Sequence, residues 1–331
     1  MAKDLRISLV IPVRDEAATI SDLLTSIHSQ TLQASEIVFV DGGSLDKTVE
    51  ILREAAHADS SLHLLEVQDA TPGRGRNVGI EAAANDWIAF TDAGIWLDPT
   101  WLERLAAEVE RDPSVNLVFG AYEAQTGTFF QQCAAAAYLA AKQQRPGGLM
   151  RGPSIASCLI HRSVWRAAGG FPDLRAAEDL VFIERCQQVA RIAWAPQAIV
   201  KWQLQPTLKA TFQRFTLYSF HNVLAGRQRY WHYGIARIYL LALVIVILAI
   251  VHSRIWLFVL GFAGIARIAR SIWNYDKQQR LAWLCNPARF FLVGTILAVV
   301  DLATFVGWGR AVWYKMKNTR TFWQKLIGER H

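Results

Sequence analysis

Acidic and glycine-containing motifs stand directly after short apolar runs in the first hundred residues of this 331-residue chain. Residues 14–16 (RDE) follow the first run, residues 41–48 (DGGSLDKT) follow the second, and residues 92–94 (DAG) follow a later one. Carboxylates in such positions can hydrogen-bond a ligand, hold a divalent cation or take a proton from a reacting group. Each motif alone is equally typical of turns and helix caps, where Asp, Gly and Ser are common. Their repetition at successive run ends favours a functional site.

The apolar runs alternate with segments of helical periodicity. Strands are predicted over 7–13, 36–40, 62–67 and 87–91, and helices over 17–29, 47–56 and 77–84. This alternation predicts an α/β fold, with a mostly parallel, Rossmann-like sheet flanked by helices. Because ligands of such sheets bind beyond the carboxyl ends of the strands, the polar motifs are expected to meet at one edge.

Several motifs share their order and spacing with a known family. They are SLVIP at 8–12, VDGGSLDKT at 40–48, GRGRNVGI at 73–80, FTDAG at 90–94, GGFP at 169–172 and EDL at 178–180. Together they resemble the family 2 glycosyltransferases of the GT-A fold, over residues 5–200. The resemblance implies that residues 1–205 form a GT-A domain that binds a nucleotide-diphosphate sugar and transfers its sugar.

The resemblance also assigns residues to the sugar donor. Pro12, Glu16 and Asp41 would contact the nucleoside, with Asp41 accepting a hydrogen bond from the base ring. Glu16 is equally typical of the first turn of a helix, where an acidic side chain faces the helix dipole. Arg74 and Arg76 would offer positive charge to the phosphates, or else lie in a solvated loop.

Asp92 stands where the family has the first carboxylate of its metal-binding Asp-x-Asp motif. The resemblance implies a divalent cation, Mn²⁺ or Mg²⁺, that neutralises the diphosphate. The third position of the motif is Gly94 instead of a second carboxylate, which weakens the case for metal dependence. Asp98, or water and diphosphate oxygens, would have to complete the coordination shell.

Asp179 matches the general base of the family, and Glu178 beside it is expected on the acceptor side. A positioned carboxylate takes the proton of an acceptor hydroxyl as the new bond forms. The alternative is an acidic pair at a helix N-terminus that faces the helix dipole. Direct attack assisted by one base inverts the anomeric carbon, a stereochemistry that the resemblance implies.

Residues 213–214 (QR) lie in a segment where processive synthases of the family carry Gln-x-x-Arg-Trp. Here Arg214 follows Gln213 directly and no Trp comes next, so addition of a single sugar is favoured over processive polymerisation. Arg214 is expected to guide an anionic acceptor, or else to belong to a basic face that lies on lipid headgroups.

The two halves of the chain differ in charge. Residues 1–200 carry a net charge of −8 and residues 201–331 a net charge of +15, which gives the overall +7. Basic residues between long apolar runs suit an anionic membrane surface, and no nucleic acid is expected as a partner. The four cysteines have no paired spacing, so neither a disulfide framework nor a structural zinc site is expected.

Long apolar segments follow residue 237. Residues 238–266 are expected to form a hairpin of two short helices, or one long tilted span, and 290–309 a third segment broken by Gly294 and Asp301. A basic amphipathic segment over 206–236 would precede these membrane helices (237–309), and a basic cytosolic tail over 310–331 would follow. Because positive loops face the cytoplasm, a hairpin with a re-entrant or in-plane third segment fits the charges. Buried core helices of a soluble domain are the alternative.

The first residues lack the pattern of a signal peptide, so the catalytic domain is expected on the cytoplasmic face of a membrane. The sequence therefore predicts a membrane-anchored inverting glycosyltransferase that adds one sugar to a lipid-linked acceptor, either a polyprenyl phosphate or a lipid-linked saccharide. The alternatives are a catalytically silent GT-A scaffold that binds nucleotide or partner proteins, and a membrane structural or transport subunit. Donor base, sugar and oligomeric state stay open.

Overall fold

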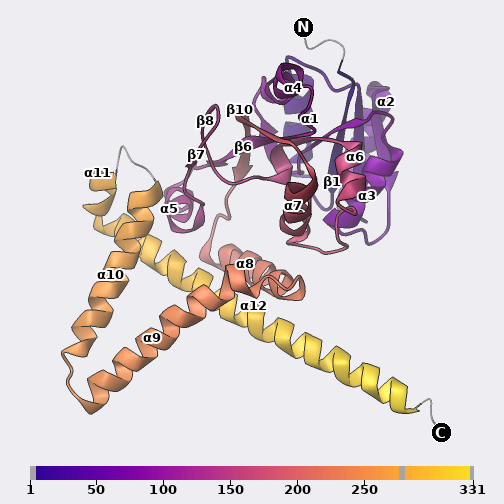
Figure 1. Ribbon diagram of the computed structural model, residues 1–331. Helices are drawn as coiled ribbons and strands as arrows, with labels where there is room; N and C mark the ends of the chain where they lie inside the picture. Colours follow the sequence, from indigo (N-terminus) through magenta and orange to yellow (C-terminus); the bar gives the residue numbers. More distant parts are fainter. Residues whose placement is uncertain (1–4, 276–279, 329–331) are drawn as a thin grey trace. The chain divides into compact units, whose positions relative to one another are not determined.

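The computed structural model describes residues 5–275 and 280–328, and the chain divides into two compact units (Figure 1). The first unit comprises Met1–Gln125 and Ala140–Gln203, and the second comprises Thr126–Leu139 and Leu204–His331. Helix α5 (Phe129–Tyr138) therefore belongs with the C-terminal helices, although strands of the first unit precede and follow it in the sequence.

An eight-stranded sheet forms the centre of the first unit, in the order β3-β2-β1-β4-β9-β6-β10-β5. β1 pairs in parallel with β2 and β4, β2 with β3, and β6 with β10, whereas β9 and β5 run antiparallel to their neighbours. The strands are β1 (Ile7–Val13), β2 (Glu36–Asp41), β3 (Leu62–Glu66), β4 (Trp87–Phe90), β5 (Ile95–Leu97), β6 (Leu117–Gln125), β9 (Cys158–His161) and β10 (Ile192–Gln203). The predicted α/β fold with a mostly parallel sheet is confirmed.

Helices cover both faces of this sheet. Leu9 and Ile11 of β1 pack into the core that includes α1, α2 and α4, whereas Val10 packs into the core that includes α3, α6 and α7. A strand buried on both faces needs a continuous apolar run, which is why β1 was predictable from its sequence. The helices are α1 (Ile20–His28), α2 (Thr48–Ala58), α3 (Pro72–Ala82), α4 (Trp101–Arg111), α6 (Arg162–Ala167) and α7 (Glu178–Val189), and a small hairpin pairs β7 (Gln143–Arg145) with β8 (Gly148–Met150).

Helix α3 begins at Pro72 instead of at the predicted residue 77. Thr71 caps it, because its hydroxyl oxygen accepts a hydrogen bond from the Arg74 N–H at 3.2 Å, and Pro72 occupies the first helical position. The first turn of this helix was not predicted because its glycines have a low helix propensity. They serve packing instead: a Cβ at Gly79 would lie 2.4 Å from Val10 Cγ1 of β1.

The second unit is built from helices. They are α5, α8 (Leu208–Leu224), α9 (His232–Val251), α10 (Trp256–Tyr275), α11 (Arg280–Leu284) and α12 (Pro287–Gly328). α12 runs along α8, where a Cβ at Gly307 would lie 2.4 Å from the Thr216 carbonyl oxygen. Ser219 of α8 donates to the Thr304 carbonyl oxygen of α12 at 2.7 Å and lies 2.8 Å from Nε2 of the buried His232. Glycine and small polar side chains thus hold these helices in close contact.

Among the residues that the structure describes, three helices are long and apolar enough to cross a bilayer: α9, α10 and residues Pro287–Asn318 of α12, with mean hydropathies of 2.8, 1.3 and 2.2. α9 and α10 have 20 residues each, the length that a hydrocarbon core requires. Apolar side chains such as Leu240 and Phe258 are exposed on them, which does not fit buried core helices of a soluble domain.

The apolar helices differ in length from the predicted segments. Two separate helices occupy the predicted hairpin segment, 238–266, and both extend beyond it because His232 and Arg267 find partners inside the unit. The predicted third segment, 290–309, lies within α12, which continues through Gly294 and Asp301 without a break. A Cβ at Gly294 would lie 2.6 Å from Ile268 Cδ1, so this glycine lets α10 approach α12.

Asp301 is 1% exposed, and it joins α9, α10 and α12. Arg267 donates from Nη2 to Asp301 Oδ1 at 2.8 Å and from Nη1 to Oδ2, while the Tyr239 hydroxyl donates to Oδ2 at 2.9 Å. An acidic side chain in an apolar helix is costly unless such partners satisfy it. The charge predicted to break the third segment therefore ties the helices together.

We expect Asp301→Leu to destabilise the helical unit by about 3 kcal/mol, because it leaves the Arg267 guanidinium without its carboxylate. The double variant Asp301→Leu/Arg267→Leu removes both charges and should recover most of the loss. Thermal unfolding of the protein in detergent measures both effects, with Leu302→Ala, an exposed neighbour on α12, as the control. Equal losses in the single and double variants would contradict this account.

Candidate active site

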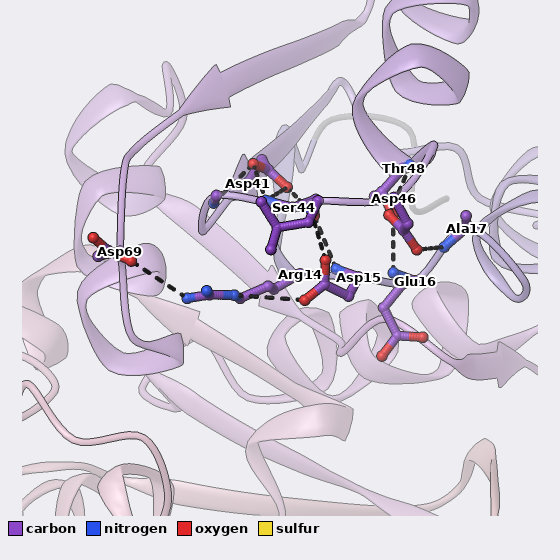
Figure 2. Close-up of polar contacts among 11 residues, drawn as sticks. Arg14, Asp15, Glu16, Ala17, Asp41, Ser44, Asp46, Thr48 and Asp69 are labelled. Carbon is purple, nitrogen blue, oxygen red and sulfur yellow. Dashed lines mark hydrogen bonds and ion pairs between the residues drawn. The ribbon is translucent and has the colours of Figure 1, made fainter.

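The loops after β1 and β2 brace each other through two reciprocal hydrogen bonds (Figure 2). The Asp15 N–H donates to Ser44 Oγ at 2.9 Å, and the Leu45 N–H donates to Asp15 Oδ1 at 2.7 Å. Asp15 has a φ of 55°, a left-handed conformation that Asp tolerates better than most residues. The braces fix the two loops relative to each other at the carboxyl edge of the sheet.

A second set of bonds joins the same loops where α1 and α2 approach (Figure 2). The Glu16 N–H donates to Thr48 Oγ1 at 2.8 Å, and the Ala17 N–H donates to Asp46 Oδ2 at 3.0 Å. The Thr48 hydroxyl and N–H both donate to Asp46 Oδ1, and the hydroxyl bond lowers the pKa of Asp46. Turn and cap chemistry is therefore present in these motifs, and it shapes the rim of the candidate site.

Pro12 and Asp41 lie at the carboxyl ends of the neighbouring parallel strands β1 and β2, where Pro12 pairs with Val40 and Asp41 pairs with Val13. Asp41 is 2% exposed and accepts from the Gly43 N–H at 2.9 Å and from the Ser44 hydroxyl at 2.5 Å. Pro12 faces α3, since a Cβ at Gly75 would lie 3.3 Å from Pro12 Cβ. The structure thus places two of the three residues predicted to contact a nucleoside at the carboxyl ends of adjacent strands, one register position apart.

The third of these residues, Glu16, ends against the loop that follows β4. Its Oε2 accepts from the Thr19 hydroxyl at 2.6 Å. Gly94 in that loop has a φ of +76°, and a Cβ there would lie 3.3 Å from Glu16 Oε2. A carboxylate side chain at position 94 would strain the backbone and meet the charge of Glu16. This geometry accounts for the glycine that replaces the second carboxylate of the Asp-x-Asp motif.

Asp92 follows β4 with its side chain 40% exposed. Asp98 Oδ1 accepts from the Thr100 N–H at 3.2 Å and from the Thr100 hydroxyl at 3.0 Å, at the start of α4, and its help in holding a cation stays a prediction. Within residues 5–275 and 280–328, no group of three or more His, Cys, Asp or Glu could hold a metal ion. Since Mg²⁺ and Mn²⁺ accept one or two carboxylates together with phosphates and water, Asp92 fits a cation bound with a diphosphate.

The two arginines of α3 have different surroundings. Arg74 is exposed, whereas the Arg76 side chain is 3% exposed. Arg76 Nη1 donates to Glu178 Oε1 at 2.9 Å, and Nη2 donates to Asp92 Oδ1. Burial alone would lower the pKa of Arg76, but the two carboxylates raise it overall, so its charge is fixed. A phosphate contact stays a prediction for both arginines, and the Arg76 guanidinium is already engaged by protein carboxylates.

Glu178 and Asp179 open helix α7, directly after Ala177 in a left-handed conformation with φ 67°. Glu178, predicted on the acceptor side, is turned to Arg76 and its side chain is only 7% exposed. Burial raises its pKa, Arg76 opposes that rise and the charge of Asp179 adds to it. Asp179 is half-buried and lies close enough to Tyr122 for its charge to help raise the tyrosine pKa, which burial raises most. Its role as a base stays a prediction.

Asn77 fastens the segment that leads into α7, a contact that was not predicted from the sequence. Its Nδ2 donates to the Phe171 carbonyl oxygen at 2.8 Å, and its Oδ1 accepts from the Phe171 N–H and from Trp165 Nε1, both at 2.9 Å. The Phe171 ring stacks on Phe182 of α7 with centroids 3.8 Å apart. Asn77 belongs to the GRGRNVGI motif, and that motif was the sequence signal that could have marked Asn77 as a residue of the site.

Arg214 lies in the second unit, on α8. Its guanidinium carbon is 5.8 Å from the centre of the Tyr218 ring, a distance at which a cation attracts an aromatic face. The predicted role of Arg214 on the acceptor side stays a prediction.

The first unit, a mostly parallel sheet flanked by helices with acidic loops at its carboxyl edge, has a GT-A-like fold. Residues 8–166 match the family model described as glycosyl transferase family 2. The chain therefore contains a domain of this family, and the resemblance seen in its motifs is confirmed. The match ends before Glu178 and Asp179, so these two residues lie outside it.

Named relatives align over part of their length. Glycosyltransferase AglE of Haloferax volcanii is 36% identical over 121 residues, which cover 35% of this chain and 39% of the relative. An undecaprenyl-phosphate 4-deoxy-4-formamido-L-arabinose transferase of Pseudomonas aeruginosa is 32% identical over 124 residues, or 36% of each chain. The chain thus spans well under half the length of these relatives.

A solved structure extends the comparison to the fold. The mannosyltransferase PcManGT of Pyrobaculum calidifontis, in complex with GDP-Man and Mn²⁺, is similar with a TM-score of 0.57 over 90% of this chain and 88% of that chain. Only 17% of the aligned residues are identical. The likeness therefore concerns the fold alone.

We expect that a second carboxylate cannot be restored in the Asp92 loop. Gly94→Asp should destabilise the protein more than Gly169→Asp, which introduces the same side chain at the same φ of +76° but has open space around its Cβ. The left-handed backbone is common to both variants, whereas repulsion from Glu16 acts only at position 94. Urea unfolding compares both variants with Gly152→Ala, where neither strain nor crowding arises. A Gly94→Asp variant as stable as the parent would refute the explanation.

Proposed function

We propose that this chain is a membrane-anchored glycosyltransferase that moves one sugar, with inversion, from a nucleotide-diphosphate sugar to a lipid-linked acceptor. The observation that carries the proposal is the arrangement of three carboxylates. Asp41 ends β2 and Asp92 follows β4 at the same edge of the sheet, and Arg76 connects Asp92 to the start of α7, which bears Asp179. A transferase needs such groups for nucleoside, diphosphate and acceptor.

The donor would lie across the carboxyl ends of β1, β2 and β4. The braced loops present Pro12, Glu16 and the fixed Asp41 carboxylate to the nucleoside. The exposed Arg74, in the first turn of α3, would meet the diphosphate, because a helix N-terminus and an arginine both favour an anion. The GDP-Man in the mannosyltransferase of similar fold supports a donor of this class.

A divalent cation, Mn²⁺ or Mg²⁺, would supply positive charge to the departing diphosphate. Asp92 is the residue that would hold it, in a loop whose glycine leaves room beside the Glu16 carboxylate. The Mn²⁺ in the mannosyltransferase complex supports this choice of cation.

Asp179 would take the proton of the acceptor. An oxygen lone pair of the acceptor hydroxyl attacks the anomeric carbon, the bond from that carbon to the diphosphate breaks, and its electron pair leaves with the diphosphate. The hydroxyl proton passes to the Asp179 carboxylate. An acceptor that attacks through a phosphate oxygen is already an anion and has no proton to lose, so the need for Asp179 distinguishes a lipid-linked saccharide from a polyprenyl phosphate.

The acceptor would be held in a membrane because of the apolar helices of the second unit. α9 and α10 would form a hairpin that crosses the bilayer and returns, which keeps the basic residues that precede α9 and follow α10 on the cytoplasmic side. α12 would lie in the interface plane, since α8, which carries Lys209 and Arg214, packs along it. The name of the undecaprenyl-phosphate sugar transferase relative supports a lipid-linked acceptor.

The direct test is release of nucleoside diphosphate by detergent-purified protein across a panel of sugar nucleotides. Each donor is tried with and without a membrane-lipid extract, and with Mn²⁺, Mg²⁺ or EDTA. We expect lipid-dependent and cation-dependent release with one donor. Nucleotide binding without release from any donor would favour the catalytically silent scaffold instead.

We expect Asp179→Asn to lower kcat by about 10²–10⁴-fold with a hydroxyl acceptor, the usual contribution of a general base. Nucleotide affinity should stay within about threefold, because the variant keeps the shape of the side chain. Asp22→Asn, an exposed carboxylate on α1, serves as the control for charge loss. Comparable turnover by the Asn variant with a lipid-linked saccharide would remove Asp179 from the mechanism.

A further inference from the structure

Arg76 connects two parts of the candidate site, the loop that bears Asp92 and the start of helix α7. Asp92, 16 residues away in the sequence, follows β4 on the donor side, and Glu178, 102 residues away, opens the helix that bears Asp179. Both terminal nitrogens of the guanidinium donate to these carboxylates, and the side chain is 3% exposed. The side chain therefore acts on carboxylates from two separate segments at once.

The surroundings of Arg76 are built to bring α3 against α7. A Cβ at Gly73 would lie 2.2 Å from the Pro172 carbonyl oxygen and 3.3 Å from Glu178 Cβ, so only a glycine permits this approach. The Phe171 ring lies 5.4 Å from the Arg76 guanidinium carbon, and Asn77 holds the Phe171 backbone on both its N–H and its carbonyl. One turn of α3 thus fixes the segment before α7, and Arg76 fixes the first residue of α7.

A buried arginine that is paired with two protein carboxylates differs in its contacts from an arginine that binds a phosphate. An arginine that binds phosphate presents its planar fork to the ligand, as the exposed Arg74 can. The fork of Arg76 is directed at Glu178 and Asp92 instead. A cation held by Asp92 would share that carboxylate with Arg76, so the two positive charges would compete for it.

We propose that Arg76 is a positioning residue that sets the distance between the donor-side carboxylate Asp92 and the acceptor-side start of α7, and that it does not bind the donor phosphates. This inference rests on the proposed function for its catalytic consequence. Because a misplacement of about 1 Å can cost about 100-fold in rate, the bridge between Asp92 and Glu178 governs turnover without touching the substrate.

The test removes the buried pair as a unit. In Arg76→Met/Glu178→Met both charges are replaced by apolar side chains of similar length, which avoids the unpaired buried charge that a single change would leave. The matched control is Arg53→Met/Glu66→Met, an exposed ion pair of the same unit with Arg53 Nη2 2.6 Å from Glu66 Oε1. Arg76→Lys keeps the charge but lacks the two-pronged fork.

We expect the double variant at the buried pair to unfold at a temperature close to that of the parent, and its kcat to fall at least about 100-fold with the donor KM changed by less than about threefold. Arg76→Lys should recover only part of kcat. The control pair should match the parent. Unchanged kcat in a folded double variant would show that the bridge has no positioning role and would overturn the proposal.

A binding measurement separates this inference from the proposed function. The affinity for UDP or GDP, whichever the parent binds with Mn²⁺, is measured by titration calorimetry and requires no turnover. We expect the double variant to bind as tightly as the parent or tighter, since Asp92 is released from its competing arginine. Binding about tenfold weaker would make Arg76 a phosphate ligand and overturn the proposal, whereas a parent that binds but never turns over would count against the proposed function alone.

Discussion

The burial of one positive charge between two negative charges is the constraint on which the candidate site depends. Removing the Arg76 guanidinium from water is costly unless both carboxylates reach it with good geometry. Glycines at 73, 75 and 79 let α3 approach its neighbours closely enough for that contact, and Asn77 holds the segment leading into α7. The motif GRGRNVGI therefore packs α3 against the strands and against the segment that leads into α7.

The donor side of the site is fixed by shorter-range bonds. Asp15, Asp46 and their partners tie the loops after β1 and β2 together, and the Asp41 carboxylate is oriented by the backbone and hydroxyl of its own turn. Such preorganisation lowers the cost of ordering a ligand site at the moment of binding. The local turn bonds would thus also orient the groups of the proposed ligand site.

The helical unit follows the same electrostatic rule in apolar surroundings. Asp301 is retained in a long apolar helix because Arg267 and Tyr239 from two other helices satisfy both of its oxygens. Small residues, Gly294 and Gly307, allow the helices to approach one another. A polar residue that appears to interrupt an apolar segment can in this way be the contact that joins several segments.

The sequence by itself determined the first four strands of the sheet, the family of the domain and the placement of Pro12 and Asp41 at one edge, because these follow from local apolar runs and from short motifs read along the chain. It did not predict β5, β6, β9 and β10, which complete the sheet. The tertiary structure decided which charges pair. It placed Arg76 between Asp92 and Glu178, assigned Asp98 to the start of α4 and lengthened α9 and α10 beyond their apolar runs. The physical reason is that a charge can be buried only where partners from distant parts of the sequence reach it. The spacing of residues along the chain does not show which of them meet in space.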